Sequence, residues 1–172
     1  MELKEKENIL QELRDKNQKI ISILCYSLMP NHYHLLLKQE EDFGIENFIC
    51  RAVNSYVKYL NTRNKRVGPL FQGAFKAVRV ETDEQMIHLS RYIHLNPVIS
   101  YLVKPQDILN YKWTSLGQYL TKTQSFIDKS FILNYFGNKD KYFMFIKDFE
   151  DYKKRIIDIE YLTLDKDFDE EY

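Results

Sequence analysis

The first residues in this sequence that could do chemistry are a pair of histidines, His32 and His34. They stand two positions apart in a segment that favours a β-strand, so both imidazoles are expected to project from the same face. Neutral imidazole is a common ligand of divalent metal ions. The spacing is compatible with a metal site, and it is equally compatible with two histidines on the solvated face of an edge hairpin.

A second candidate pair, Tyr92 and Asn96, stands four positions apart in a segment with helix signals. This spacing places a phenol and an amide on one helix face, about one turn apart. A tyrosine can attack phosphorus and keep the cleaved strand as a phosphotyrosine if a cation withdraws charge from the phosphate oxygens. Because the chain has 13 tyrosines, spacing alone does not distinguish this role from a structural tyrosine packed under a sheet.

The segments around these candidates predict an α+β fold. Residues 19–29 are rich in apolar and β-branched side chains, the pattern breaks at Pro30 and Asn31, and residues 32–38 resume it, so a hairpin is expected. Residues 75–81 alternate between apolar and polar and predict another strand.

Helices are expected before, between and after these strands along the chain. Residues 4–16 and 44–64 carry apolar side chains at helical spacing, and a further helix is expected at residues 139–157. Residues 82–95 begin with a capping box formed by Thr82 and Gln85, and Pro97 is expected to end that helix.

Charge is strongly segregated along the chain, although the formal net charge is zero. Residues 47–80 contain seven basic side chains and no acid, and the basic residues are Arg51, Lys58, Arg63, Lys65, Arg66, Lys76 and Arg79. Such a segment could track a DNA backbone, or it could simply be a solvated helix face. The last eight residues hold five acids against one lysine and are expected to be disordered.

Length and composition limit the remaining possibilities. The 172 residues suit one domain at residues 1–120 with a helical C-terminal extension at residues 121–164 and an acidic tail at residues 165–172. No long apolar stretch indicates a membrane span or a secretory signal, so a cytoplasmic location is the default expectation. Cys25 and Cys50 lack metal-site spacing and are expected to be buried thiols without chemistry.

Three segments together resemble the REP-associated tyrosine transposases, relatives of the small insertion-sequence transposases within the single-tyrosine, His-hydrophobic-His superfamily. They are YSLMPNHYHLLL at residues 26–37, GPLFQGAFK at residues 68–76 and LSRYIHLNPV at residues 89–98. The segments follow the family's order, and the resemblance spans roughly residues 5–120.

The resemblance implies a function and a site. His32 and His34 would bind a divalent ion, Mg²⁺ or Mn²⁺, and Tyr92 would be the nucleophile. Asn96 matches the position of a metal-binding glutamine in related enzymes, but its side chain is shorter. The substrate would be single-stranded hairpin DNA, cleaved to a 5′-phosphotyrosine and a free 3′-hydroxyl without ATP.

The resemblance also implies a ferredoxin-like antiparallel sheet with helices on one face, and here the sequence departs from the family. Family members usually carry a strand before the first helix, whereas this chain starts directly at that helix. A missing strand would leave backbone groups without partners and open a sheet edge. We therefore expect a homodimer that completes the sheet, unless the chain is a fragment or a decayed copy.

Three functions are consistent with these observations. The first is a metal-dependent single-stranded DNA endonuclease and strand transferase. The second is a truncated, non-catalytic protein that still binds DNA hairpins. The third is a metal-dependent phosphodiesterase in which water attacks and Tyr92 is structural.

Overall fold

The computed structural model describes residues 19–121 and 125–148 together with Glu5, Asn8, Tyr152 and Leu162. The elements, in chain order, are β1 (Ile21–Leu28), β2 (Tyr33–Gln39), α2 (Gly44–Asn64), α3 (Asp83–Ile99), the 3₁₀-helix η1 (Pro105–Asn110), α4 (Leu116–Leu120), α5 (Ser130–Phe136) and α6 (Lys139–Lys147). The fold class is α+β, as predicted. The helix expected at residues 4–16, most of the helix beyond Lys147 and the acidic tail at residues 165–172 lie outside the described residues.

The chain forms two compact units that are not the predicted divisions. One comprises Met1–Ser22 and Lys38–Leu70, and the other comprises Ile23–Leu37 and Phe71–Tyr172. The first unit holds α2, and the second holds α3 and the helices that follow it. The boundaries expected at residues 120 and 164 stay predictions. None of the helices in the described part of the chain is long and apolar enough to cross a membrane.

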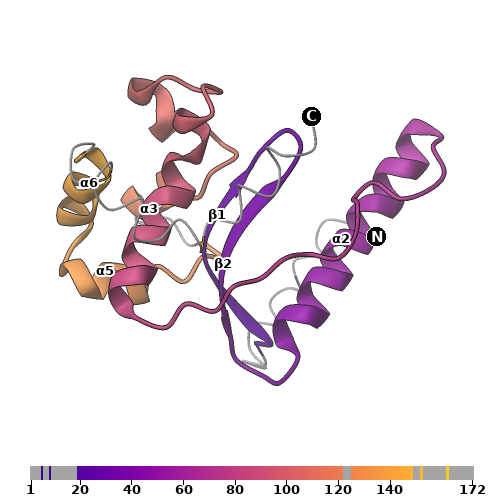
Figure 1. Cartoon of the computed structure of the whole chain (residues 1–172), viewed down its shortest axis with the longest axis horizontal. Coiled ribbons are helices and arrows are strands. Elements are labelled where there is room, and N and C mark those ends of the chain that lie inside the picture. The colour runs from indigo at the N-terminus through magenta and orange to yellow at the C-terminus, as the bar shows by residue number, and fades with distance from the viewer. Residues whose placement is uncertain are drawn as a thin grey trace. The chain divides into compact units, whose positions relative to one another are not determined.

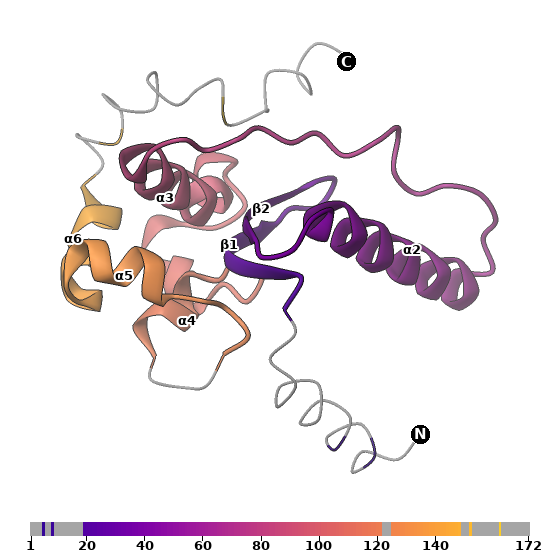
Figure 2. The same cartoon turned by 90° about the horizontal axis from the view of Figure 1, so that it is seen from below.

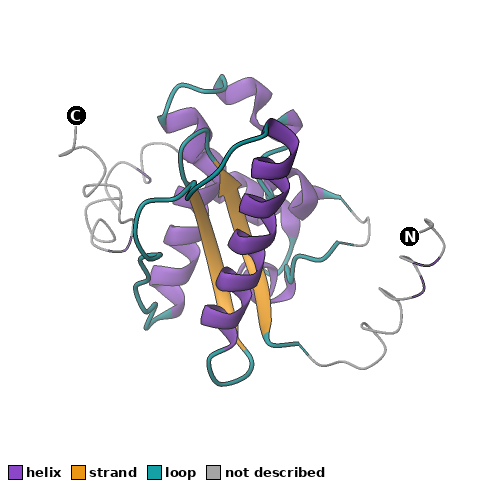
Figure 3. Ribbon diagram, turned by 90° about the vertical axis from the view of Figure 1, so that its right-hand side faces the viewer, coloured by secondary structure: helices purple, strands orange, loops and turns teal. Residues whose placement is uncertain are grey.

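The predicted hairpin is confirmed. β1 and β2 pair in a two-stranded antiparallel sheet, which Figure 3 shows as two neighbouring arrows. The turn around Pro30 is closed by a hydrogen bond of 2.9 Å from the Met29 amide to the His32 carbonyl. His32 thus lies in the turn, one residue before β2 begins.

The other edge of β1 is covered by segments that belong to no named strand. Isolated bridges join Ser27 to Thr114 and Ile23 to Ile127. Three backbone bonds accompany them, from Leu28 N to Trp113 O at 2.8 Å, from Ser115 N to Tyr26 O at 3.0 Å and from Asp128 N to Ile23 O at 2.9 Å. Because these bonds pair the edge of β1, this strand needs no second chain to complete it. The homodimer stays a prediction that concerns β2.

The strand predicted at residues 75–81 is wrong. These residues have no regular secondary structure and run as the long connection between α2 and α3, visible in Figure 1. Alternation of apolar and polar residues makes a strand only where a neighbouring strand supplies hydrogen-bond partners, and in the described residues the sheet contains β1 and β2 alone. The ferredoxin-like arrangement accordingly stays a prediction.

Helix α2 begins and ends at the predicted residues, Gly44–Asn64. It starts directly after Phe43, which has a left-handed backbone with φ of 59°. A Cβ atom at Gly44 would come within 2.1 Å of the Ile20 carbonyl oxygen, so this close approach requires glycine. The residue that follows the helix, Lys65, is also left-handed, and its amide caps the last turn.

Helix α3 begins as predicted but continues past Pro97. Thr82 and Gln85 form the complete capping box, whereas the helix ends only at Ile99. Proline removes one backbone donor, but near the end of a helix little of the ladder remains to be broken. The Ser100 amide bonds to Asn96 O, and the Leu102 amide bonds to Pro97 O, so this last turn is closed by other donors.

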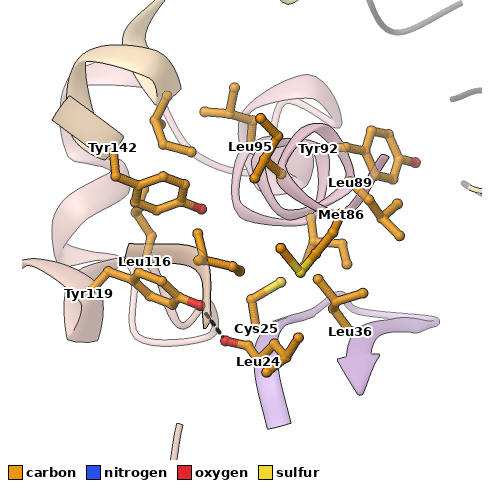
Figure 4. Close-up of a cluster of buried hydrophobic side chains, with 14 of the residues drawn as sticks. Leu24, Cys25, Leu36, Met86, Leu89, Tyr92, Leu95, Leu116, Tyr119 and Tyr142 are labelled. Carbon is orange, nitrogen blue, oxygen red and sulfur yellow. Dashed lines mark hydrogen bonds between the residues drawn. The ribbon is translucent and has the colours of Figure 1, made fainter. Parts of the chain in front are cut away.

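The core of the second unit lies between the hairpin and its helices. Cys25 of β1 and Leu36 of β2 pack with Met86, Leu89 and Leu95 of α3 (Figure 4). Helix α6 contacts α3, α4 and α5, which Figure 2 shows gathered together. The Tyr119 hydroxyl donates to the Leu24 carbonyl, which ties α4 to β1.

Candidate active site

The two histidines lie against each other at the start of β2. Their ring centroids are 4.9 Å apart, and the ring planes meet at 83°. His34 belongs to β2, and His32 precedes it in the turn. The prediction that both imidazoles share one face is confirmed.

Asn31 fixes how the His32 ring is protonated. Its side-chain oxygen lies 2.7 Å from Nδ1 of His32. An amide oxygen can only accept, so the ring proton belongs on Nδ1 and Nε2 keeps its lone pair. Such a partner orients a metal-binding histidine. The sequence reasoning assigned no role to Asn31, although its position directly before the histidine was a usable signal.

Helix α3 brings Tyr92 and Asn96 to His34. The rings of Tyr92 and His34 are 5.7 Å apart and nearly perpendicular, at 80°. The Asn96 amide nitrogen lies 3.3 Å from Nε2 of His34. The predicted convergence is confirmed as geometry for His34, which meets both Tyr92 and Asn96, and it is achieved within one unit of one chain.

Tyr92 lies at the rim of the core rather than at its centre. Its side chain is only 5% exposed, but its hydroxyl points away from the other labelled side chains in Figure 4. Asn96 is 2% exposed. The tyrosine ring is therefore held by packing, while its hydroxyl is directed out of the cluster.

Burial keeps both histidines of the pair neutral. Burial, together with the neighbouring charge of His32, lowers the pKa of His34 to about 4. Burial also lowers the pKa of His32. At neutral pH both rings are therefore in the form that offers a lone pair to a metal ion.

The donor groups fit a divalent ion, although they are few. Among the described residues, no three His, Cys, Asp or Glu side chains gather into a metal-binding group. The donors at this site are two imidazoles and the amide of Asn96, whose oxygen and nitrogen exchange places by a half-turn of the side chain. A mixed nitrogen and oxygen set suits several divalent metals. Whether Asn96 binds metal stays a prediction.

The opposite face of α3 is anchored by a buried polar network that the sequence reasoning missed. His94 is fully buried, with one ring nitrogen 2.7 Å from the Tyr142 hydroxyl and the other 2.8 Å from the Ser115 hydroxyl. The Ser115 hydroxyl also accepts from the Tyr26 amide at 2.9 Å. Burial lowers the pKa of His94 to about 3. This network connects α3 to α6 and to β1, and so helps to position Tyr92.

The predicted DNA-binding residues are all exposed, and they belong to both units. Arg51, Lys58 and Arg63 lie on α2, and Lys65 and Arg66 follow it directly, all in the first unit. Lys76 and Arg79 lie on the connection to α3, in the second unit. Their role stays a prediction.

Comparison with known families identifies the chain. The model of the family described as "Transposase IS200 like" matches residues 2–96, more than half of the 172 residues. This match includes His32, His34, Tyr92 and Asn96. Comparisons with curated proteins and with solved structures find no significant match. The chain belongs to the IS200-like transposase family.

Proposed function

We propose that this chain is an endonuclease and strand transferase that cuts single-stranded hairpin DNA through a covalent bond to Tyr92. The proposal is carried by one observation, the approach of Tyr92 and Asn96 on α3 to His34 on β2. A tyrosine beside one of two adjacent neutral imidazoles supplies a candidate nucleophile and candidate metal ligands for attack on a phosphodiester. Membership in a transposase family supports the same class of reaction.

In the proposed reaction, Tyr92 forms and later breaks the covalent bond to the DNA. The Tyr92 oxygen forms a bond to phosphorus and loses its proton to water, and the bond from phosphorus to the 3′-oxygen breaks. The departing oxygen takes up a proton, which leaves a free 3′-hydroxyl and a 5′-phosphotyrosine. Strand transfer is the reverse step, in which a different 3′-hydroxyl attacks the same phosphorus and releases Tyr92.

In this proposal the two histidines would bind the divalent metal ion that stabilises negative charge on the phosphate. Mg²⁺ or Mn²⁺, when bound by His32 and His34 with the Asn96 oxygen, would withdraw charge from the phosphate oxygens. Asn31 holds the His32 ring by accepting a hydrogen bond from Nδ1. The basic residues, from Arg51 to Arg79, would bind the DNA backbone and supply most of the affinity.

Two rival functions give different results in one experiment. The full chain is incubated with Mn²⁺ and an end-labelled hairpin oligonucleotide, and the products are separated on a denaturing gel. The proposal expects a protein-DNA adduct that disappears in Tyr92→Phe together with cleavage. Cleavage without an adduct that persists in Tyr92→Phe would mean that water attacks. Absence of any cleavage, with binding intact, would mean a non-catalytic protein, an alternative that a family match across the whole site does not favour.

A further inference from the structure

The outer face of α2 carries a shallow hollow of about 450 Å³. Its lining residues recur every three or four positions along one side of the helix, and they are Ser55, Lys58, Tyr59, Thr62 and Arg63. Among the described residues, the lining of the hollow therefore comes from α2 alone. It combines one aromatic ring, two cations and two hydroxyls.

Tyr59 is the main feature of this hollow. Its side chain is 57% exposed, a large aromatic surface in contact with solvent. Arg63 holds it in place, because its guanidinium donates to the Tyr59 hydroxyl at 3.0 Å and lies 6.0 Å from the ring centroid. A single exposed tyrosine needs no explanation. A tyrosine fixed by an arginine beside a second cation is different, because it presents a ring face flanked by positive charge.

The positive charges around Tyr59 favour an anionic ligand in the hollow. Residues 47–80 contain seven bases and no acid, and Lys58 and Arg63 lie within the hollow itself. An anion that carries a flat apolar group would match both the positive charge and the exposed ring. A nucleotide is such an anion, because it joins a phosphate to a flat base. In duplex DNA the faces of the bases are stacked inside the helix, whereas in a single strand they can stack on a protein ring.

We propose that Tyr59 is a stacking platform for an unpaired base of single-stranded DNA, with Lys58 and Arg63 contacting the adjacent phosphates. The inference rests on the proposed function, which supplies single-stranded DNA as the substrate. It adds a binding residue on α2 that the charge pattern alone did not select.

Binding measured without cleavage tests the inference. The full chain is titrated into a fluorescein-labelled 20-nucleotide oligo(dT) and into a duplex of the same length, in EDTA, with fluorescence anisotropy as the readout. Because base stacking on an aromatic residue is worth about 1–3 kcal/mol, Tyr59→Ala is expected to weaken single-strand binding roughly five- to 150-fold. Tyr59→Phe keeps the ring and should stay within about twofold of the native chain. Duplex binding should not change in either variant.

Salt dependence separates stacking from charge. Tyr59→Ala should leave the slope of log K against log salt unchanged, whereas Arg63→Gln should reduce it by about 0.7 on a single strand. Photo-crosslinking with 5-iododeoxyuridine in the oligonucleotide should recover the peptide that contains Tyr59. The inference is overturned if both Tyr59 variants lose affinity equally, if neither loses affinity, or if the duplex is affected as much as the single strand.

These readouts are independent of the proposed chemistry. If the adduct to Tyr92 forms but Tyr59→Ala binds normally, only the stacking inference fails. If Tyr59→Ala loses single-strand affinity but no adduct forms in the native chain, only the proposed chemistry fails.

Discussion

Replacing His94 with alanine is expected to lower the free energy of unfolding, because it removes a buried link on the face of α3 opposite Tyr92. The substitution removes two hydrogen bonds, to Tyr142 and to Ser115, from a fully buried position. Neither partner loses all its contacts, because the Tyr142 hydroxyl lies 3.1 Å from the Ser90 hydroxyl and Ser115 donates to the Tyr26 carbonyl at 3.3 Å. Two net hydrogen bonds at about 1 kcal/mol each, plus a cavity of imidazole size, give a loss of about 3–4 kcal/mol.

The loss should depend on pH in a defined direction. Burial lowers the pKa of His94 to about 3 in the folded chain, whereas an unfolded histidine titrates near 6.5. The stability that neutral His94 contributes is therefore complete above pH 6.5 and decreases as the pH falls towards 3. One proton corresponds to about 1.4 kcal/mol per pH unit, so the difference between the native chain and His94→Ala should shrink by about 2 kcal/mol between pH 6.5 and pH 5.

Urea denaturation followed by circular dichroism at pH 7 and pH 5 measures both quantities. His32→Ala is the matched control, because it makes the same substitution at a half-buried histidine outside the network and should cost less than about 1 kcal/mol. The other histidines are present in both the native chain and His94→Ala, so their titration cancels in the difference. A loss below about 1 kcal/mol at pH 7, or a difference that grows on acidification, would refute the assignment of His94 as a buried neutral link.

Three further outcomes follow from the structure. His32→Ala and His34→Ala should each abolish cleavage while hairpin binding stays within about twofold, because the metal acts on transition-state charge and the basic surface supplies affinity; equal loss of both in gel-shift and cleavage assays would mean that the histidines hold the fold or the DNA. Thr82→Ala should lower the unfolding free energy by about 1 kcal/mol in urea denaturation, because it removes the side-chain cap of α3; an unchanged midpoint would contradict the capping role. The prediction that both cysteines are buried is right for Cys25 and wrong for Cys50, which is exposed; burial also raises the pKa of Cys25, so the native chain should react with Ellman's reagent at one thiol and the unfolded chain at two; rapid reaction of both thiols in the native chain would show that the core opens.

Local signals predicted the elements whose stability is local. The apolar spacing of residues 44–64 and the capping box at Thr82 both describe interactions within a few residues, and the structure confirms the helix bounds and the cap. Residues 75–81 have an equally regular pattern but no strand to pair with. Instead, Trp113 and Asp128 bond to the edge of β1 through contacts 85 and 105 positions apart in sequence, since Leu28 pairs with Trp113 and Ile23 with Asp128. No local pattern contains that information.

The sequence predicted the central residues of the candidate site but not the residues that support them. The histidine pair is a local spacing, and its convergence with Tyr92 followed from the requirement that one phosphate reach both. The supporting residues were not predictable in this way, because the partners of His94 lie on α6 and before α4. His94 and Tyr92 occur in the same short segment, and only the structure separates a residue directed at the site from one directed at the core.

The segment of α3 that holds Tyr92 and His94 is rich in polar side chains although it is deeply buried. Every residue from Met86 to Pro97 is buried, yet the stretch includes Ser90, Arg91 and His94. Burying a polar group is costly unless it is bonded, and each of these side chains is engaged: Ser90 and His94 with the Tyr142 hydroxyl, and the Arg91 guanidinium with the Phe145 carbonyl at 3.1 Å. Directional bonds on the core side restrict both rotation and sliding of the helix, which apolar packing alone does less strictly. Because Tyr92 lies about 200° around the axis from His94, fixing one face of α3 fixes where the tyrosine ring on the other face meets His34.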